Sequence, residues 1–109
     1  MAISSIGSGT QTATVDTEHV LDTETDPGVY MLVVDTANMV NGDYLTLKIK
    51  VKCLSGGTSR IAFQATYAHI QAEPIKYSPP VPADIELVVT LEQDAGTSRD
   101  FPWSLLKVG

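Results

Sequence analysis

The sequence predicts a small all-β protein, an antiparallel β-sandwich with Greek-key or jelly-roll-like connections. Three observations favour this fold class. Six segments have the alternating or continuous apolar patterns of strands, almost nothing has the period of a helix, and a proline-rich connection is long enough to cross between two sheets. A chain of 109 residues is long enough for one domain with its own core.

The N-terminal segment differs in composition from the rest of the chain. Residues 1–10 are small and polar and include two glycines, so their own burial cannot offset the entropy of ordering. We expect a flexible arm there, either without a role or ordered on a neighbouring subunit. Residues 11–109 then form the single sandwich domain. Its first strand is Thr12–Leu21, and a turn follows at Asp26-Pro27-Gly28.

The second strand, Val29–Val34, is apolar on both of its faces. This pattern is typical of a central strand that is covered on both sides. Alternatively, a partner subunit can cover one of the two faces of this strand. The residues proposed for such an oligomer interface are Tyr30, Leu32 and Val34.

A hairpin is predicted from Tyr44–Leu54 and Arg60–Gln71, which flank a glycine-containing loop. The first of these strands alternates strictly, which indicates one buried face and one solvated face. Its solvated face carries Lys48, Lys50 and Lys52. Cys53 falls on the apolar face, so we expect it to behave as a small buried hydrophobic residue, and as the single cysteine it can form no internal disulfide.

The connection at residues 72–83 contains four prolines and favours an extended conformation, as a crossover between sheets or an exposed loop. Asp84–Glu92 alternates again and Phe101–Val108 is the last strand, with Trp103 as a core anchor. No apolar run approaches the length of a membrane span, and nothing near Met1 resembles a signal peptide. We therefore expect a protein made in the cytoplasm, without a membrane partner.

The net charge of −6 disfavours a nucleic-acid partner, which would require a basic surface. The charges are unevenly distributed. Five acids lie without an intervening cation between Asp16 and Asp26, and the three lysines form a stripe on one strand. The acids can lie across from the lysines, or each group can face a partner.

No pattern of catalytic or cofactor-binding residues emerges, so the sequence predicts a protein that is not an enzyme and holds no cofactor or metal. His19 and His69 have no second ligand at zinc spacing. The acids from Asp22 to Asp26 resemble a calcium loop, but Pro27 and Val33 occupy positions that require Gly and Glu. A looser calcium site in this turn remains an alternative.

Three segments carry a resemblance to a known group of proteins. They are GTQTATV from Gly9, GVYMLVVDTANMVNGDYLTLKIKVK from Gly28 and AHIQAEPIKYSPPVPADIELVVTLEQ from Ala68. In order and style they resemble small all-β structural proteins of tailed bacteriophages, and most of all capsid decoration (cement) proteins. The resemblance implies a virion protein that binds and stabilises the phage head. Its partners would be the major capsid protein and copies of itself, in a homo-oligomer such as a trimer.

Two other roles stay open. A tail or head–tail connection subunit would share the resemblance, whereas a carbohydrate-binding module would use exposed aromatic residues, for which Tyr44 and Tyr77 are the candidates. For the capsid role, a partner would contact the lysine stripe or the proline-rich connection. The candidate contact residues are Lys48, Lys50, Lys52, Tyr77, Pro79 and Pro80.

Overall fold

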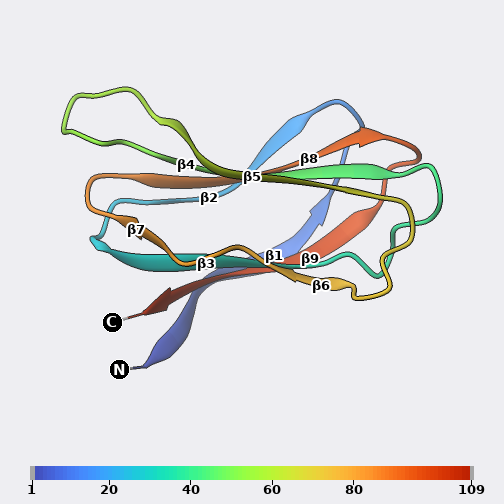
Figure 1. The fold of residues 1–109 in the computed structure, drawn as a ribbon, viewed down its shortest axis with the longest axis horizontal. Helices are drawn as coiled ribbons and strands as arrows, with labels where there is room; N and C mark the ends of the chain where they lie inside the picture. Colours follow the sequence, from blue (N-terminus) through green and yellow to red (C-terminus); the bar gives the residue numbers. More distant parts are fainter. Residues whose placement is uncertain (1, 109) are drawn as a thin grey trace.

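Two antiparallel β-sheets face each other in the computed structural model, which describes residues 2–108 (Figure 1). The described residues form nine strands and no helix, which confirms the prediction of an all-β sandwich. The strands are β1 (Ile3–Thr12), β2 (Glu18–Glu24), β3 (Gly28–Asp35), β4 (Tyr44–Val51), β5 (Arg60–Ala68), β6 (Ile75–Tyr77), β7 (Val81–Ala83), β8 (Leu87–Ala95) and β9 (Asp100–Val108).

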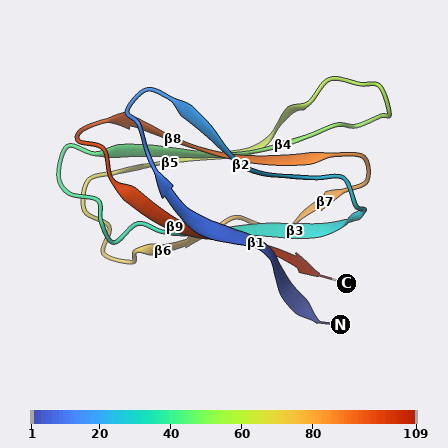
Figure 2. The same cartoon turned by 180° about the vertical axis from the view of Figure 1, so that it is seen from behind.

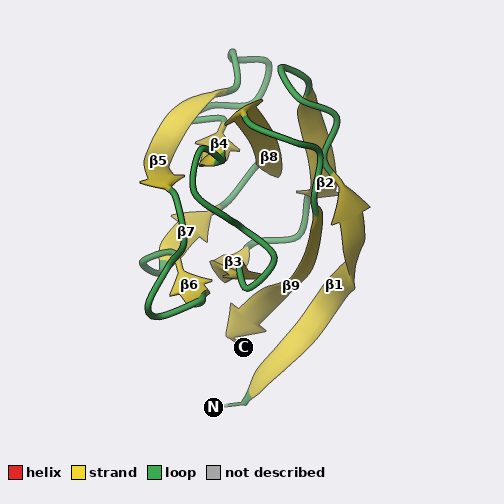
Figure 3. Ribbon diagram, turned by 90° about the vertical axis from the view of Figure 1, so that its right-hand side faces the viewer, coloured by secondary structure: helices red, strands yellow, loops and turns green. Residues whose placement is uncertain are grey.

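The strand order is that of a jelly roll. One sheet, called sheet A here, has the order β1-β9-β3-β6, and β7 pairs with β3 beside β6. The other, sheet B, has the order β2-β8-β4-β5. Seen from one end, the two sheets form two layers (Figure 3). Apart from the β4–β5 hairpin, most connections cross from one layer to the other, as in two interlocked Greek keys.

The core lies between the sheets and follows from the alternation of each strand. Every second residue points inward, and in the central strands most of these inward positions are apolar and almost completely buried. Sheet A contributes Tyr30, Leu32, Val34, Phe101 and Leu105. Sheet B contributes Leu45, Leu47, Ile49, Leu87, Val89 and Leu91. The alternation of buried and exposed side chains that was predicted from Tyr44 and from Asp84 onward is therefore confirmed in β4 and β8.

The prediction of a flexible N-terminal arm is wrong for residues 3–10, which the structure describes as part of a strand. Residues 3–12 form β1, which pairs with β9 along its length, so the sandwich begins with this strand (Figure 2). Backbone hydrogen bonds to β9 order the segment without a need for large apolar side chains. Its glycines suit this position, because Gly9 lies against the indole of Trp103. Met1 lies outside the described residues.

The proline-rich segment connects the sheets, as expected, and it also adds two short strands. β6 and β7 both pair with β3, on the edge opposite β9. Between them, Ser78 continues the ladder, because its backbone N–H donates to Leu32 O and its hydroxyl accepts from Leu32 N, each at 2.9 Å. The central position predicted for β3 is confirmed.

The predicted hairpin is confirmed by the pairing of β4 with β5, but Cys53 is not buried. β4 ends at Val51, and the chain then leaves the sheet in a loop that projects beyond the sandwich (Figure 1). The alternating pattern continues past the point where the strand stops. Cys53 therefore lies on the exposed loop rather than on the inner face.

At the other end of the sandwich, Asp43 joins three loops. Its buried carboxylate accepts hydrogen bonds from Val40 N at 3.0 Å, Thr97 N at 3.2 Å and Arg99 Nε at 2.9 Å. Its backbone oxygen accepts from His69 N at 2.8 Å. Burial alone would raise the pKa of Asp43, but these donors and the Arg99 charge hold it below its ordinary value.

Replacement of Asp43 by Asn should destabilise the protein at neutral pH. The carboxylate is charged there, and its loss leaves buried donors poorly paired, which costs roughly 1–3 kcal/mol. Because the folded pKa is lowered, this stability is present above the unfolded pKa of about 3.9 and is lost as the pH falls through the folded value. Urea unfolding at neutral and acidic pH measures both effects.

The matched control is Asp84→Asn, because Asp84 is exposed. Wild type and Asp84→Asn should have similar stability at both pH values. If Asp43→Asn were as stable as wild type at neutral pH, the Asp43 junction would not be a stabilising element.

Candidate functional site

The outer face of sheet A carries almost no charge. The pairing register places Val29, Met31 and Val33 of β3 on this face, opposite Val108, Leu106 and Ser104 of β9. Of the outward positions on the sheet, only Asp35 and Asp100 are charged, and both lie at one end of it. We call this surface the apolar face; its members are Ile3, Val29, Met31, Val33, Ile75, Tyr77, Pro82, Pro102, Leu106 and Val108, with the hydroxyls of Ser5, Ser8, Thr10 and Ser104.

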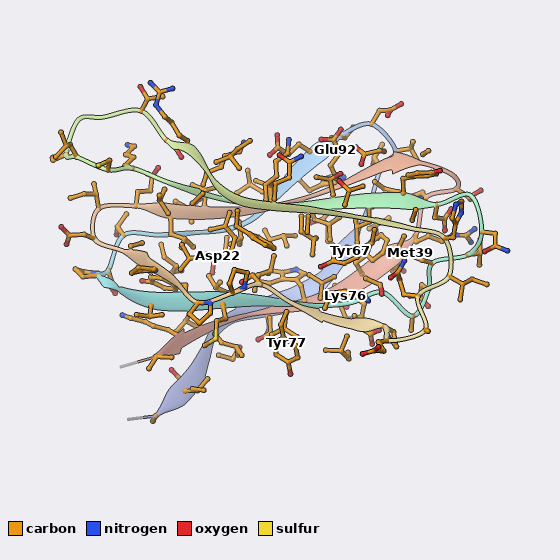
Figure 4. The ribbon with its side chains drawn as sticks, viewed as in Figure 1. Asp22, Met39, Tyr67, Lys76, Tyr77 and Glu92 are labelled. Carbon is orange, nitrogen blue, oxygen red and sulfur yellow. The ribbon has the colours of Figure 1, made fainter. Side chains whose placement is uncertain are left out.

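Several side chains of the apolar face are open to solvent. Tyr77 is 64% exposed, Ile3 62% and Ile75 47%. In Figure 4, Tyr77 points away from the sandwich, whereas Lys76 points between the sheets, where it lies over the ring of Tyr67. The solvated face of an antiparallel sheet is ordinarily polar. An apolar face of this extent is typical of a surface that contacts another molecule.

A shallow hollow lies on the same face, close to β6. It has a volume of about 230 Å³, and its lining includes Val33, Ile75 and Pro102. The hollow is on the side of the sheet where Tyr77 pairs with Val33. The apolar face therefore has a concave region that extends from its centre toward β6.

The outer face of sheet B is different, because it carries charges of both signs. Lys50 pairs with Glu18 at 2.9 Å, and Lys52 pairs with Glu86 at 3.7 Å. The hydrogen bond from Lys50, more than any other contact, holds the pKa of Glu18 below its ordinary value. Pairing between the acidic segment and the lysine stripe is thus confirmed for Glu18. Lys48 takes part in none of the three ion pairs found within residues 2–108.

The next acids of that segment turn toward the inside of the sandwich. A bulge at Leu21 shifts the register of β2, so that Asp22 and Glu24 pair with the inward positions Val89 and Leu87. Burial, and then the charge of Asp22, raise the pKa of Glu24. Within residues 2–108, no group of three or more potential metal ligands is found, so the structure gives the calcium alternative no support.

The prediction that Tyr30, Leu32 and Val34 form an oligomer interface is wrong, because all three are on the buried face of β3. Tyr30, Leu32 and Val34 are at most 1% exposed, because they form the core against sheet B. They are not accessible to a partner. The opposite face of the same strand, with Val29 and Val33, is the one that sheet B leaves uncovered.

The structure separates the two tyrosines proposed for sugar binding. Tyr77 is on the outer face of sheet A, and Tyr44 is on sheet B, where its ring contacts His69 edge to face at 5.3 Å. They share no surface, which removes the geometric basis for a sugar site built on this pair. The remaining contact candidates, Pro79 and Pro80, are exposed and follow Tyr77 at the margin of the apolar face.

Both histidines have partners within the chain. His19 Nε2 accepts a hydrogen bond from Thr14 N at 3.0 Å, and His69 Nδ1 accepts from Gly42 N at 2.9 Å. His69 follows the end of β5 and has a positive φ of 65°, so it lies in a turn rather than in the predicted strand.

The projecting β4–β5 loop contains a second hollow that was not predicted from the sequence. Its volume is about 310 Å³, and its lining includes Cys53, Leu54, Arg60 and Ile61. Leu54 is 71% exposed and Ile61 51%. The repeated apolar residues on both sides of the glycine-containing turn are the only sequence signal for this hollow.

Comparison with known proteins gives a likeness in fold. The crystal structure of a protein called PirA matches with a TM-score of 0.62 and 13% sequence identity, over 96% of each chain. No family model and no curated protein matches the sequence. At this identity the likeness concerns the fold alone. Within residues 2–108 there is also no helix with the length and hydropathy to cross a membrane.

The exposed position of Cys53 predicts its reactivity. A maleimide reagent should modify Cys53 in the folded protein at a rate comparable to that of a small free thiol, because no structure has to open first. Mass spectrometry over time gives the rate, and Cys53→Ser is the control for other sites. Modification that requires denaturant would contradict the exposed loop.

Replacement of Glu24 by Gln should stabilise the protein at neutral pH. Because the folded pKa is raised, the charged form is disfavoured in the folded state, and this penalty disappears as the pH falls through the folded value. Removal of the charge should raise the free energy of unfolding by up to about 1 kcal/mol. Thermal unfolding at neutral and acidic pH, with the exposed Glu73→Gln as control, measures the difference; a destabilised Glu24→Gln would contradict it.

Proposed function

We propose that this protein is a non-enzymatic structural subunit of a virion, a decoration (cement) protein that binds the phage head and reinforces it. The observation that carries the proposal is the contrast between its two outer faces. Sheet A presents an apolar face, and sheet B presents a charged face with a lysine stripe. A subunit that joins an assembly by more than one contact requires surfaces of this kind.

The apolar face would supply contact energy within the assembly. Burial of apolar surface is worth roughly 25 cal/mol per Å², and salt does not screen it. Exposed Tyr77 is of the type that dominates contact energies. The neighbouring Pro79 and Pro80 have little conformational entropy to lose on docking.

The lysine stripe would supply the contact with the shell. Lys50 and Lys52 are held by carboxylates of the same chain, so Lys48 is the member best placed to reach a carboxylate of the capsid protein. A contact of this kind adds selectivity and speeds association more than it adds affinity. If the protein binds the assembled shell and not the free capsid subunit, it stabilises the shell by mass action. The order of the three sequence segments that resemble decoration proteins supports the same role.

The test is binding to shells assembled from the major capsid protein of the same virus. Sedimentation should bring the protein down with the shells, and the bound protein should raise the temperature at which shells break. The Lys48→Gln variant should bind about tenfold more weakly at low salt, a change of roughly 1.4 kcal/mol, and nearly normally at high salt.

Lys107→Gln is the matched control. It removes the same charge from the other sheet, where Lys107 lies over the ring of Tyr30. Its shell binding should equal that of wild type. A wild-type protein that stays in the supernatant at every salt concentration would contradict the proposed function.

A further inference from the structure

We propose that the apolar face is covered by the same face of a second copy of this chain, in a two-fold symmetric dimer with the two A sheets packed face to face. This inference rests on the proposed function, in which the apolar face is a contact within the assembly. It identifies the molecule that makes that contact. Three features of the face lead to a second copy: its charge, its size and the order of its strands.

The charge of the face favours a like partner. The chain has a net charge of −6, but only two charged side chains, Asp35 and Asp100, are at outward positions of sheet A, and both lie at one end of the face. Their carboxylates already accept hydrogen bonds within the chain, from Ala37 N at 2.9 Å and from Thr12 Oγ1 at 2.7 Å. Two copies can therefore approach through this face with their other acids turned away. A strongly charged partner would find no complementary charge here.

The size of the face fits the requirement of a stable dimer. Four strand positions about 4.8 Å apart and nine residues at about 3.3 Å each give a footprint of roughly 19 by 30 Å, or about 570 Å² before side-chain relief is added. A standard interface buries about 800 Å² per partner. Two copies together would bury about 2 × 570 = 1,140 Å², which is below the standard size but above the roughly 1,000 Å² in total that a specific interface requires.

The strand order makes the face complementary to itself. The most apolar strands, β3 and β9, are in the middle, the hydroxyl-bearing β1 is on one side, and β6 with Tyr77 is on the other. A two-fold axis parallel to the strands places β3 over the partner's β9 and β1 over the partner's β6. Apolar residues then meet apolar residues, and Tyr77 meets hydroxyl groups such as that of Ser8. This is the self-complementary arrangement that a closed dimer requires.

The experiment is a measurement of mass in solution by light scattering over a range of concentrations. The full chain should reach twice its own 11.7 kDa, that is 2 × 11.7 = 23.4 kDa. Val33→Lys, which places a charge at the centre of the face, should be monomeric. Gln64→Lys is the matched control on the outer face of sheet B and should remain a dimer.

A second variant covers the case in which Val33→Lys does not fold. Ser8 is exposed in the single subunit, so Ser8→Lys should fold normally and still weaken the dimer about tenfold or more. A wild-type chain that is monomeric at all concentrations would overturn the dimer, and so would a dimer that both folded variants leave unchanged.

The shell-binding test separates this inference from the proposed function. A monomeric wild-type chain that still sediments with shells would overturn the dimer alone. A dimer that dissociates in Val33→Lys and Ser8→Lys, but does not sediment with shells, would support the dimer and overturn the virion role.

Discussion

The pairing of β3 on both of its edges is the constraint on which the rest of the structure depends. Hydrogen bonds to β9 on one edge and to β6 and β7 on the other fix β3 at the centre of sheet A. Once the strand is fixed, alternation sends Tyr30 inward and Val29 outward. Both sets of side chains are apolar. A sheet with one side buried in the core therefore presents a second apolar side to its surroundings.

The two sheets differ in the side chains that their outer faces carry. On sheet B, two of the three lysines pair with carboxylates, Lys50 with Glu18 and Lys52 with Glu86, and this pattern suits a surface in water. Sheet A has hydroxyls on β1 and apolar groups on β3 and β9 in the same positions. The Asp43 junction lies at the loop end, away from both faces, and joins Val40, Thr97 and Arg99 there. The residues that stabilise the loop end are therefore different from those proposed to contact partners.

The sequence predicted the elements that alternation or turn chemistry determines locally. The hairpin of β4 and β5 was visible because Leu45 and Lys48 can lie on opposite sides only in a strand. The buried side of β3 was not visible, because Leu32 and Val33 are equally apolar and only the second sheet distinguishes them. Residues of the buried side, such as Leu32, were therefore wrongly predicted to be accessible to a partner.

Other features depend on contacts between distant segments. β1 has no apolar period, and its order comes from backbone pairing with β9, almost a full chain length away. Cys53 continues the pattern of β4 after the pairing has stopped. From the sequence, Asp43 resembles an ordinary loop residue, because its partner Arg99 is 56 positions further along the chain. A single sequence shows none of these three relations.

The central claim is that a partner covers the apolar face of sheet A in the assembled protein. Methyl NMR with a soluble paramagnetic probe tests it directly, because Met31 lies on that face and Met39 is buried in the core. The account predicts that the Met31 methyl is protected at high concentration and becomes accessible on dilution, while Met39 stays protected throughout. A Met31 methyl that is equally accessible at every concentration and on the assembled shell would contradict it.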